Sequence, residues 1–221
     1  MKIKFTGIVF LILFTVLASF AQTYDREKIW EADMKRFSEI DRTQTPPDGA
    51  VLFVGSSSIR LWQTLRQDFP NLKVINRGFG GSQFEDVNHY FAQIVTPYKP
   101  KKIVLYVGEN DIDAKQTAEN VLEDFKTFVA LRDKNLPNTP IVFITLKPSV
   151  LRWQMWAEMN KANNLIKEEI KKHKRVQFAD LAAKMLSADG KPLPDIYVED
   201  NLHLNAKGYK IWRENLLPFL K

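Results

Sequence analysis

The sequence contains no cysteine and only three histidines among its 221 residues. The absence of cysteine excludes a disulfide scaffold, a thiol nucleophile and a cysteine-ligated zinc or iron–sulfur site. It also excludes the lipid-modified cysteine that anchors a bacterial lipoprotein. Chemistry that depends on an imidazole is limited to three candidates, which are His89, His173 and His203.

The composition also lacks the marks of a disordered or nucleic-acid-binding protein. Hydrophobic residues make up 45% of the chain and charged residues 26%, which is an ordinary globular composition. The length predicts one domain, or two at most. The formal net charge of +6 is spread along the chain, so we expect no nucleic-acid partner.

Residues 1–21 have the layout of a secretory signal peptide. Two lysines precede an apolar run of 13 residues at 5–17, and Ala21 ends a small-x-small cleavage pattern. A membrane-spanning helix needs ~20 apolar residues, so the run is short for that role. We therefore expect cleavage after Ala21, export to the periplasm or the medium, and no stable membrane insertion afterwards. An uncleaved N-terminal anchor is the alternative.

Strand-like and helix-like segments alternate over residues 22–221, which we expect to form a single domain. Strands are predicted at 50–54, 73–76, 102–107, 140–145 and 176–178, and helices at 24–42, 87–94, 121–129, 155–172 and 208–220. The run at 50–54 is continuously apolar, as in a parallel strand buried on both faces. Alternating strands and helices predict an α/β protein with a three-layer sandwich, on which residues 22–48 form an N-terminal helical extension.

Polar residues with catalytic potential follow three of the predicted strands and recur near the C-terminus. Three serines follow the first strand, a glycine-rich loop at 76–82 follows the second, and Asn110 follows the third. Asp200 lies three residues before His203. Ligands of open parallel sheets bind at the carboxyl ends of the strands, so we expect these segments to meet. Each also has a simpler interpretation as a helix N-cap, a tight turn or a loop histidine.

Taken together, the four segments resemble the four sequence blocks of the SGNH hydrolases, in the GDSL esterase/lipase superfamily. Gly55-Ser56-Ser57 aligns with Gly-Asp-Ser, Asn76-x-Gly78-x-Gly80-Gly81 with the second block, Gly108-x-Asn110-Asp111 with Gly-x-Asn-Asp, and Asp200-x-x-His203 with Asp-x-x-His. The resemblance covers residues from about 50 to 221. It implies a flavodoxin-like sheet of about five strands in the order 2-1-3-4-5. It also implies the catalytic residues Ser57, Gly81, Asn110, Asp200 and His203.

Two positions depart from the family pattern. Ser56 stands where the family usually has aspartate before the nucleophile, and Ser82 stands where many members have aspartate. Neither position is obligatory for the chemistry, but the departures indicate a subgroup whose substrate cannot be borrowed from better-known members. The residues alone do not choose among the three serines; the family register selects Ser57.

The expected chemistry is hydrolysis of a carboxylic ester through an acyl-enzyme. His203 accepts the Ser57 proton, and Asp200 holds the imidazole in the required tautomer. The backbone N–H groups of Ser57 and Gly81 and the side-chain amide of Asn110 bind the oxyanion. We expect neither a metal nor an organic cofactor.

The substrate is less clear from the sequence. Arg77, Lys147 and Arg152 are candidates for binding a polar or anionic substrate, although surface ion pairing and helix packing explain such residues equally simply. Trp62 is expected in the core, and no long apolar insertion provides a lipase lid. We therefore expect a small-acyl (acetyl-type) ester of a polar molecule or carbohydrate. An acyltransferase with the same site and a non-catalytic glycan- or anion-binding module are the alternatives.

Overall fold

The computed structural model describes residues 25–221, so the expected signal peptide at 1–21 lies outside the described residues. Five parallel strands form one sheet in the order β2-β1-β3-β4-β5, as the sequence predicted. The strands are β1 (Val51–Gly55), β2 (Val74–Gly78), β3 (Lys102–Tyr106), β4 (Ile141–Ile144) and β5 (Val176–Ala179). In the described part of the chain, no helix is both long and apolar enough to cross a membrane.

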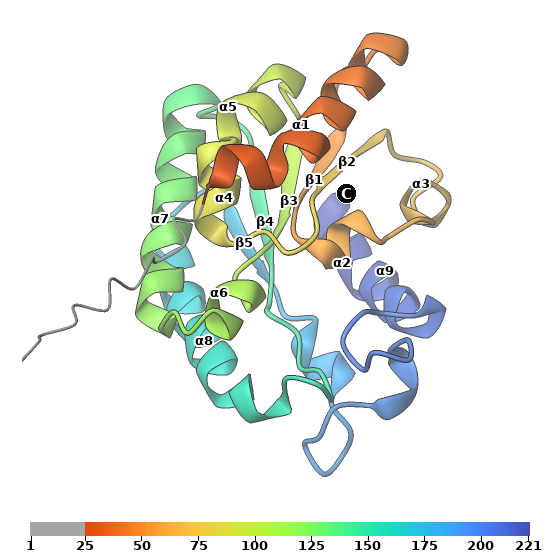
Figure 1. The fold of residues 1–221 in the computed structure, drawn as a ribbon, viewed down its shortest axis with the longest axis vertical. Coiled ribbons are helices and arrows are strands. Elements are labelled where there is room, and N and C mark those ends of the chain that lie inside the picture. The colour runs from red at the N-terminus through yellow and green to blue at the C-terminus, as the bar shows by residue number, and fades with distance from the viewer. Residues whose placement is uncertain (1–24) are drawn as a thin grey trace, which may run out of the picture.

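Helices cover both faces of the sheet and complete the three-layer α/β/α sandwich (Figure 1). One layer contains α1 (Arg26–Thr43), α4 (Phe84–His89), α5 (Phe91–Ile94), α7 (Ala118–Asn135) and α8 (Trp156–Ile170). The other contains α2 (Ser57–Arg60), α3 (Leu65–Asp68) and α9 (Ala206–Leu220). A short helix, α6 (Glu109–Asp113), follows β3.

The two layers follow from the alternation of side chains along each strand. In β1, Leu52 and Val54 pack toward α4 and α7, whereas Val51 and Phe53 pack toward α3 and α9. All five residues of β1 are buried, because helices cover both faces. The expected core residue Trp62 is buried in the second layer, where its ring stacks on Tyr209.

Helix α1 packs on the first layer through the apolar side chains Trp30, Met34 and Phe37. The N-cap residue Asp25 begins the helix by accepting a hydrogen bond from the backbone N–H of Lys28. The aromatic ring of Trp30 meets Phe79 edge to face, with the ring centroids 5.1 Å apart. This contact places α1 directly beneath the glycine-rich loop that follows β2.

The structure differs from the predicted elements mainly at their boundaries. The helix expected at 87–94 is two short helices, α4 and α5, which are separated at Tyr90. Apolar spacing continues across that break, and for this reason the sequence pattern did not reveal it. The strand expected at 140–145 is limited to Ile141–Ile144.

Strand register brings the catalytic candidates to one edge of the sheet. Gly55 at the end of β1 is level with Gly78 in β2 and with Tyr106 in β3. The segments that follow these three residues carry the serines, the glycine-rich loop and Asn110, respectively. Parallel strands that end together therefore deliver three of the four sequence blocks to the same place.

Candidate active site

Gly55 makes the turn that exposes Ser57. Its φ of 142° and its close packing leave no room for a side chain, because an added Cβ would lie 1.8 Å from the carbonyl oxygen of Tyr106. The chain then enters α2, whose N-cap is Ser56 and whose first residue is Ser57. Ser56 and Ser58 are each only 2% exposed, whereas Ser57 is half-buried. Of the three serines, Ser57 is thus the one that a substrate can reach.

His203 links Ser57 to Asp200. The imidazole Nε2 lies 3.0 Å from Oγ of Ser57, and Nδ1 lies 2.6 Å from Oδ2 of Asp200. The other carboxylate oxygen of Asp200 accepts the backbone N–H groups of Leu202 and His203, both at 2.8 Å. These contacts close a tight loop that holds both side chains on one side, with Asn201 at φ 58°.

The electrostatics of this loop set the tautomer of His203. Burial raises the pKa of Asp200, but hydrogen bonds from the His203 side chain and from the two backbone N–H groups outweigh burial and lower it to about 2. Asp200 is therefore ionised at neutral pH, and its carboxylate accepts a hydrogen bond from the N–H at Nδ1 of His203. That leaves Nε2 with its lone pair directed at the Ser57 hydroxyl.

Gly81 lies in the loop after β2, and this loop contacts α6, which carries Asn110. Gly81 is exposed and has a φ of 86°, a left-handed conformation that a residue with a Cβ adopts only under strain. The side-chain nitrogen of Asn110 donates to the carbonyl oxygen of Ser82 at 3.0 Å, so it lies directly beside the glycine-rich loop. Phe84 strengthens the junction, because its backbone N–H donates to Asp111 at 2.9 Å.

A buried charge network lies behind Asn110. Glu109 receives hydrogen bonds from both Lys147, at 3.0 Å, and the hydroxyl of Tyr106, at 2.5 Å. Burial raises the pKa of Glu109, but the positive charges of Lys147 and Arg152 outweigh burial and lower it, so the carboxylate is ionised. Arg152 also donates to the side-chain oxygen of Asn110 at 3.1 Å.

Two of the three candidate substrate-binding cations are thus part of this network. Lys147 is 1% exposed and is committed to Glu109, while Arg152 touches Asn110 directly. Glu109 and Tyr106 were not predicted. The available signal was the pair of opposite charges after neighbouring apolar strands, Glu109 after β3 and Lys147 after β4.

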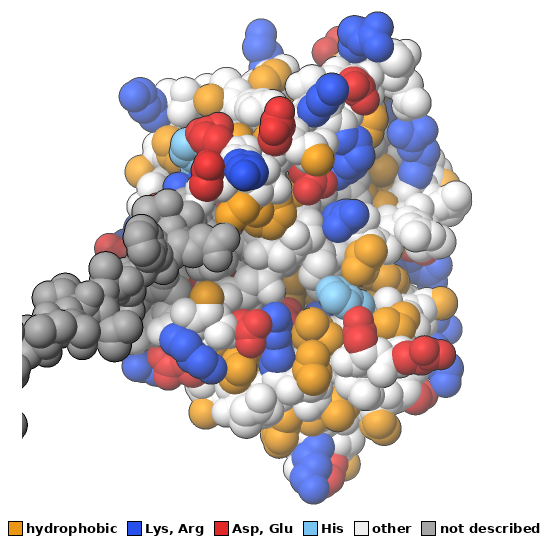
Figure 2. Space-filling model, viewed as in Figure 1, with side chains coloured by type: hydrophobic (Ala, Val, Ile, Leu, Met, Phe, Trp, Pro, Cys, Tyr) orange, Lys and Arg blue, Asp and Glu red, His pale blue; other side chains and the backbone are white. Residues whose placement is uncertain are grey.

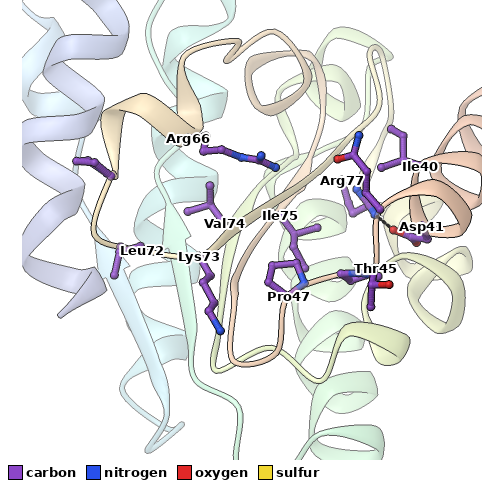
Figure 3. Close-up of a pocket in the computed structure, with 13 residues that line it drawn as sticks. Ile40, Asp41, Thr45, Pro47, Arg66, Leu72, Lys73, Val74, Ile75 and Arg77 are labelled. Carbon is purple, nitrogen blue, oxygen red and sulfur yellow. Dashed lines mark hydrogen bonds and ion pairs between the residues drawn. The ribbon is translucent and has the colours of Figure 1, made fainter.

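Arg77, the third candidate, lies away from Ser57 and His203. Its guanidinium pairs with Asp41 of α1 (Figure 3), and it donates to the hydroxyl of Tyr98 at 2.7 Å. The side chain is buried and faces α1, whereas its neighbour Asn76 faces α2, where it donates to the carbonyl oxygen of Ile59 at 2.6 Å. The cavity of about 450 Å³ beside Arg77 therefore lies on the β2 side of the sheet and includes none of the predicted catalytic residues.

A second cavity, of about 610 Å³, adjoins His203 and Asp200. Residues on its walls come from the segment after α2, from the loop that carries His203 and from α9, and they include Leu61, Gln63, Val198, Tyr209 and Lys210. The wall is therefore mixed, with apolar side chains beside polar ones. Figure 2 shows hydrophobic side chains gathered around a histidine on this face of the molecule.

Among residues 25–221, no group of three or more histidine, aspartate and glutamate side chains is arranged to hold a metal ion. The predicted catalytic serine, histidine and aspartate are joined by hydrogen bonds beside the glycine-rich loop and the carboxamide of Asn110. These are the kinds of group that acyl transfer requires.

Comparisons with known proteins identify a family and match the fold. The sequence profile of the GDSL-like Lipase/Acylhydrolase family matches residues 33–211. A Streptococcus pneumonia protein proposed to be a platelet activating factor superimposes with a TM-score of 0.79 at 19% identity, over 88% of this chain and 94% of that chain. A GDSL-like lipase from Bacteroides thetaiotaomicron gives a TM-score of 0.72 at 20% identity, over 86% of this chain and 97% of that chain.

A mutant of an acetyl-xylooligosaccharide esterase from Geobacillus Stearmophilus gives a TM-score of 0.62 at 18% identity, over 79% of this chain and 95% of that chain. Identities this low show a shared fold and nothing finer. A comparison with curated protein sequences gives no match.

Proposed function

The chain belongs to the GDSL-like lipase/acylhydrolase family and is a carboxylic ester hydrolase, and on this premise we propose that it works through an acyl-enzyme on Ser57. One observation carries the proposal. A continuous chain of hydrogen bonds runs from Asp200 to Nδ1 of His203, at 2.6 Å, and from Nε2 of His203 to Oγ of Ser57, at 3.0 Å. A serine hydroxyl is a weak nucleophile at neutral pH and needs such a base.

In the first step Oγ of Ser57 attacks the carbonyl carbon of the ester while its proton passes to Nε2 of His203. The carbonyl oxygen becomes an oxyanion. When the tetrahedral intermediate collapses, the bond to the alcohol oxygen breaks and His203 returns the proton to the leaving alcohol. Ser57 then carries the acyl group as an ester.

Water completes the cycle by the same route. His203 removes a proton from water, the hydroxide attacks the acyl carbon, and the second intermediate collapses to release the carboxylic acid. Ser57 regains its proton from His203. Asp200, ionised because its pKa is lowered to about 2, stabilises the imidazolium that forms in each half of the reaction.

The oxyanion is bound by the backbone N–H groups of Ser57 and Gly81 and by the side-chain nitrogen of Asn110. Support comes from the left-handed conformation of Gly81 and from the hydrogen bond of 3.0 Å between Asn110 and the carbonyl of Ser82, the residue that follows Gly81. Removing one donor of this kind typically costs ~2.7–4 kcal/mol of transition-state stabilisation.

The substrate class is a small acyl ester, acetyl in type, on a polar molecule or carbohydrate. The mixed wall of the cavity beside His203 suits an alcohol that has both polar and apolar faces. Trp153 and Trp156, stacked with ring centroids 6.1 Å apart near Arg152, offer aromatic surface of the kind on which sugar rings pack. Acetylated xylooligosaccharides, the substrate named for one of the structures with the same fold, are a rational first probe.

Export is proposed from residues 1–21 alone, with cleavage after Ala21. The test is N-terminal sequencing of the protein recovered from the periplasmic and extracellular fractions, where Gln22 should be the first residue. Protein that retains Met1 in the membrane fraction would instead support the uncleaved anchor.

Labelling with a fluorophosphonate, followed by peptide mapping, tests the proposed nucleophile. We expect the label on Oγ of Ser57 and its loss in the His203→Ala variant. A label elsewhere, or a His203→Ala protein that still reacts at the wild-type rate, would overturn the mechanism. Assaying hydrolysis with and without added glycerol or xylose separates a hydrolase from a transferase, because only a transferase forms the new ester.

A further inference from the structure

The carboxamide of Asn110 is held at both of its polar ends. The nitrogen donates to the Ser82 carbonyl at 3.0 Å, and the oxygen accepts from Nη1 of Arg152 at 3.1 Å. An amide nitrogen has two N–H groups, and Ser82 takes one of them. The second is the donor that an oxyanion would use.

Arg152 can hold this oxygen in place because its own side chain is anchored. Its guanidinium donates to Asp113 at 2.8 Å and to Glu109 at 3.3 Å, and the side chain is only 12% exposed. Arg152 follows β4, whereas Asn110, Glu109 and Asp113 lie in α6 after β3. The arginine therefore ties the segment after β4 to helix α6.

Glu109, which accepts a hydrogen bond from Arg152, is itself fixed by buried contacts. Its side chain is only 4% exposed, and its carboxylate also pairs with Lys147 at 3.0 Å and accepts the Tyr106 hydroxyl at 2.5 Å. Because these partners come from the strands and loops beneath the site, Glu109 moves only if the core moves. Arg152 thus connects the buried core to the side-chain oxygen of Asn110.

We propose that Arg152 is a positioning residue that keeps the nitrogen of Asn110 turned toward the oxyanion, an inference that rests on the proposed function. A carboxamide can rotate by half a turn and exchange its oxygen and nitrogen. In that flipped state the nitrogen would face the guanidinium, donor against donor, and the oxygen would face the Ser82 carbonyl. Arg152 makes the flipped state unfavourable. Its positive charge also draws electron density toward Oδ1, which strengthens the N–H as a donor.

This role differs from the binding of an anionic substrate, which the sequence suggested for Arg152. A substrate-binding arginine is free to follow its ligand, whereas this one is held against α6, because three of its five N–H groups donate to Asn110, Glu109 and Asp113. The two roles predict different kinetics. Positioning affects the transition state and lowers kcat, whereas substrate binding affects KM.

A double-mutant cycle tests the proposal with p-nitrophenyl acetate as substrate. We expect Arg152→Met to lower kcat about tenfold or more with KM nearly unchanged. In an Asn110→Ala background the same substitution should have almost no further effect, because the group through which Arg152 acts is gone. A KM increase at constant kcat, or effects that multiply in the double variant, would overturn the proposal.

Two controls separate positioning from folding. Arg36→Met removes a cation of the same type that pairs with Asp33 on α1, far from Asn110 in the sequence, and should leave kcat unchanged. Arg152→Lys keeps the positive charge and should recover part of the lost kcat. If Arg36→Met lowered kcat as much as Arg152→Met, the effect would be one of general charge loss.

A second readout does not depend on catalysis. The side-chain NH₂ resonances of Asn110 can be assigned in a ¹⁵N spectrum by their disappearance in Asn110→Ala. We expect Arg152→Met to shift or broaden them, and unchanged resonances would contradict the proposal. If Ser57→Ala retained full esterase activity, the proposed function would fail, yet this spectrum would still report whether Arg152 orients Asn110.

Discussion

Nε2 of His203 lies 3.0 Å from Oγ of Ser57, although 146 residues separate them in the sequence. Ser57 is the first residue of α2, which directly follows β1, and His203 lies in the tight loop before α9. Helices α2 and α9 are both on the same face of the sheet, where the hydroxyl of Tyr209 donates to the backbone carbonyl of Ser58 at 3.1 Å. This buried contact keeps the two segments together independently of the catalytic pair.

Replacing Ser57 with alanine should abolish ester hydrolysis. We expect a loss of about 10⁴-fold or more in kcat, because no nucleophile remains for the acyl-enzyme. Ser58→Ala is the matched control, since it removes the neighbouring hydroxyl, which is buried, and should retain activity. The assay is p-nitrophenyl acetate hydrolysis, with circular dichroism as a check on folding. An active Ser57→Ala protein would move the nucleophile elsewhere.

Asn110→Ala should lower kcat by ~10²-fold or more, because one oxyanion donor is lost. Asn110→Asp should be at least as damaging, since it puts a carboxylate where the oxyanion forms. The control is Asn135→Ala at the end of α7, where the side chain donates only to a helix carbonyl, at 2.7 Å to Leu131. A normal kcat in Asn110→Ala would make Asn110 a loop-joining residue without a role in the chemistry.

Asp200→Asn should lower kcat by about 10³–10⁴-fold, because an amide at this position favours the wrong imidazole tautomer. Asp200 has a pKa of about 2, so it stays ionised from pH 4 upward. Asp200 itself therefore contributes no change in activity between pH 5 and 8. Asp195→Asn, an exposed carboxylate paired with Lys207 near the same loop, is the control.

The lowered pKa of Asp200 also determines how the free energy of unfolding changes in acid. The folded value of about 2 lies below the ordinary 3.8, so Asp200 stabilises the fold above pH 4 and loses that contribution as the pH falls toward 2. Asp200→Asn should reduce the difference between urea-unfolding free energies measured at pH 5 and pH 2.5. An unchanged difference would mean that the carboxylate is not held by His203 in solution.

The sheet was predictable because its strands are short, apolar and regularly interrupted. The strand at 51–55 is buried on both faces and therefore carries an unmistakable apolar run. The choice among Ser56, Ser57 and Ser58 was not predictable from the residues, because it depends on which side chains the turn at Gly55 buries. The family register made that choice; in the structure Ser57 is half-buried, whereas Ser56 and Ser58 are buried.

The sequence did not reveal which groups the side chains of Arg77 and Arg152 contact. Arg77 and Arg152 both follow or end apolar strands, yet Arg77 faces α1 and pairs with Asp41, while Arg152 reaches Asn110. Strand parity could have separated Arg77, since it shares a face with Ile75 and not with Asn76. The contact of Arg152 depends on the path of an irregular loop, for which the sequence has no periodic signal.

Asp111 next to Asn110 should make the stability of the protein depend on pH in the opposite sense to Asp200. Burial is the largest cause that raises its pKa, to about 7, and the nearby carboxylates Asp124 and Asp86 add to it. One of its oxygens accepts the N–H of Phe84, and the other is buried with no hydrogen-bond partner among residues 25–221. The folded protein therefore holds a proton there that the unfolded chain releases.

The raised pKa of Asp111 determines how the free energy of unfolding changes with pH. A carboxyl whose folded pKa is raised from 3.8 to about 7 costs nothing below pH 4, where both states are protonated. Between pH 4 and 7 the unfolded state ionises and the folded state does not, so the free energy of unfolding falls as the pH rises. Above pH 7 this contribution is constant.

Asp111→Asn should remove this penalty, because the carboxamide oxygen can still accept the Phe84 N–H while no charge needs to be buried. We expect the variant to be more stable than wild type at pH 8, by roughly 1–3 kcal/mol, and equally stable near pH 4, as measured by urea unfolding. Asp124, whose pKa burial raises to about 6, contributes in the same direction, so Asp111→Asn should reduce the pH slope without abolishing it. A variant whose advantage were the same at pH 4 and pH 8 would show that Asp111 does not titrate in this window.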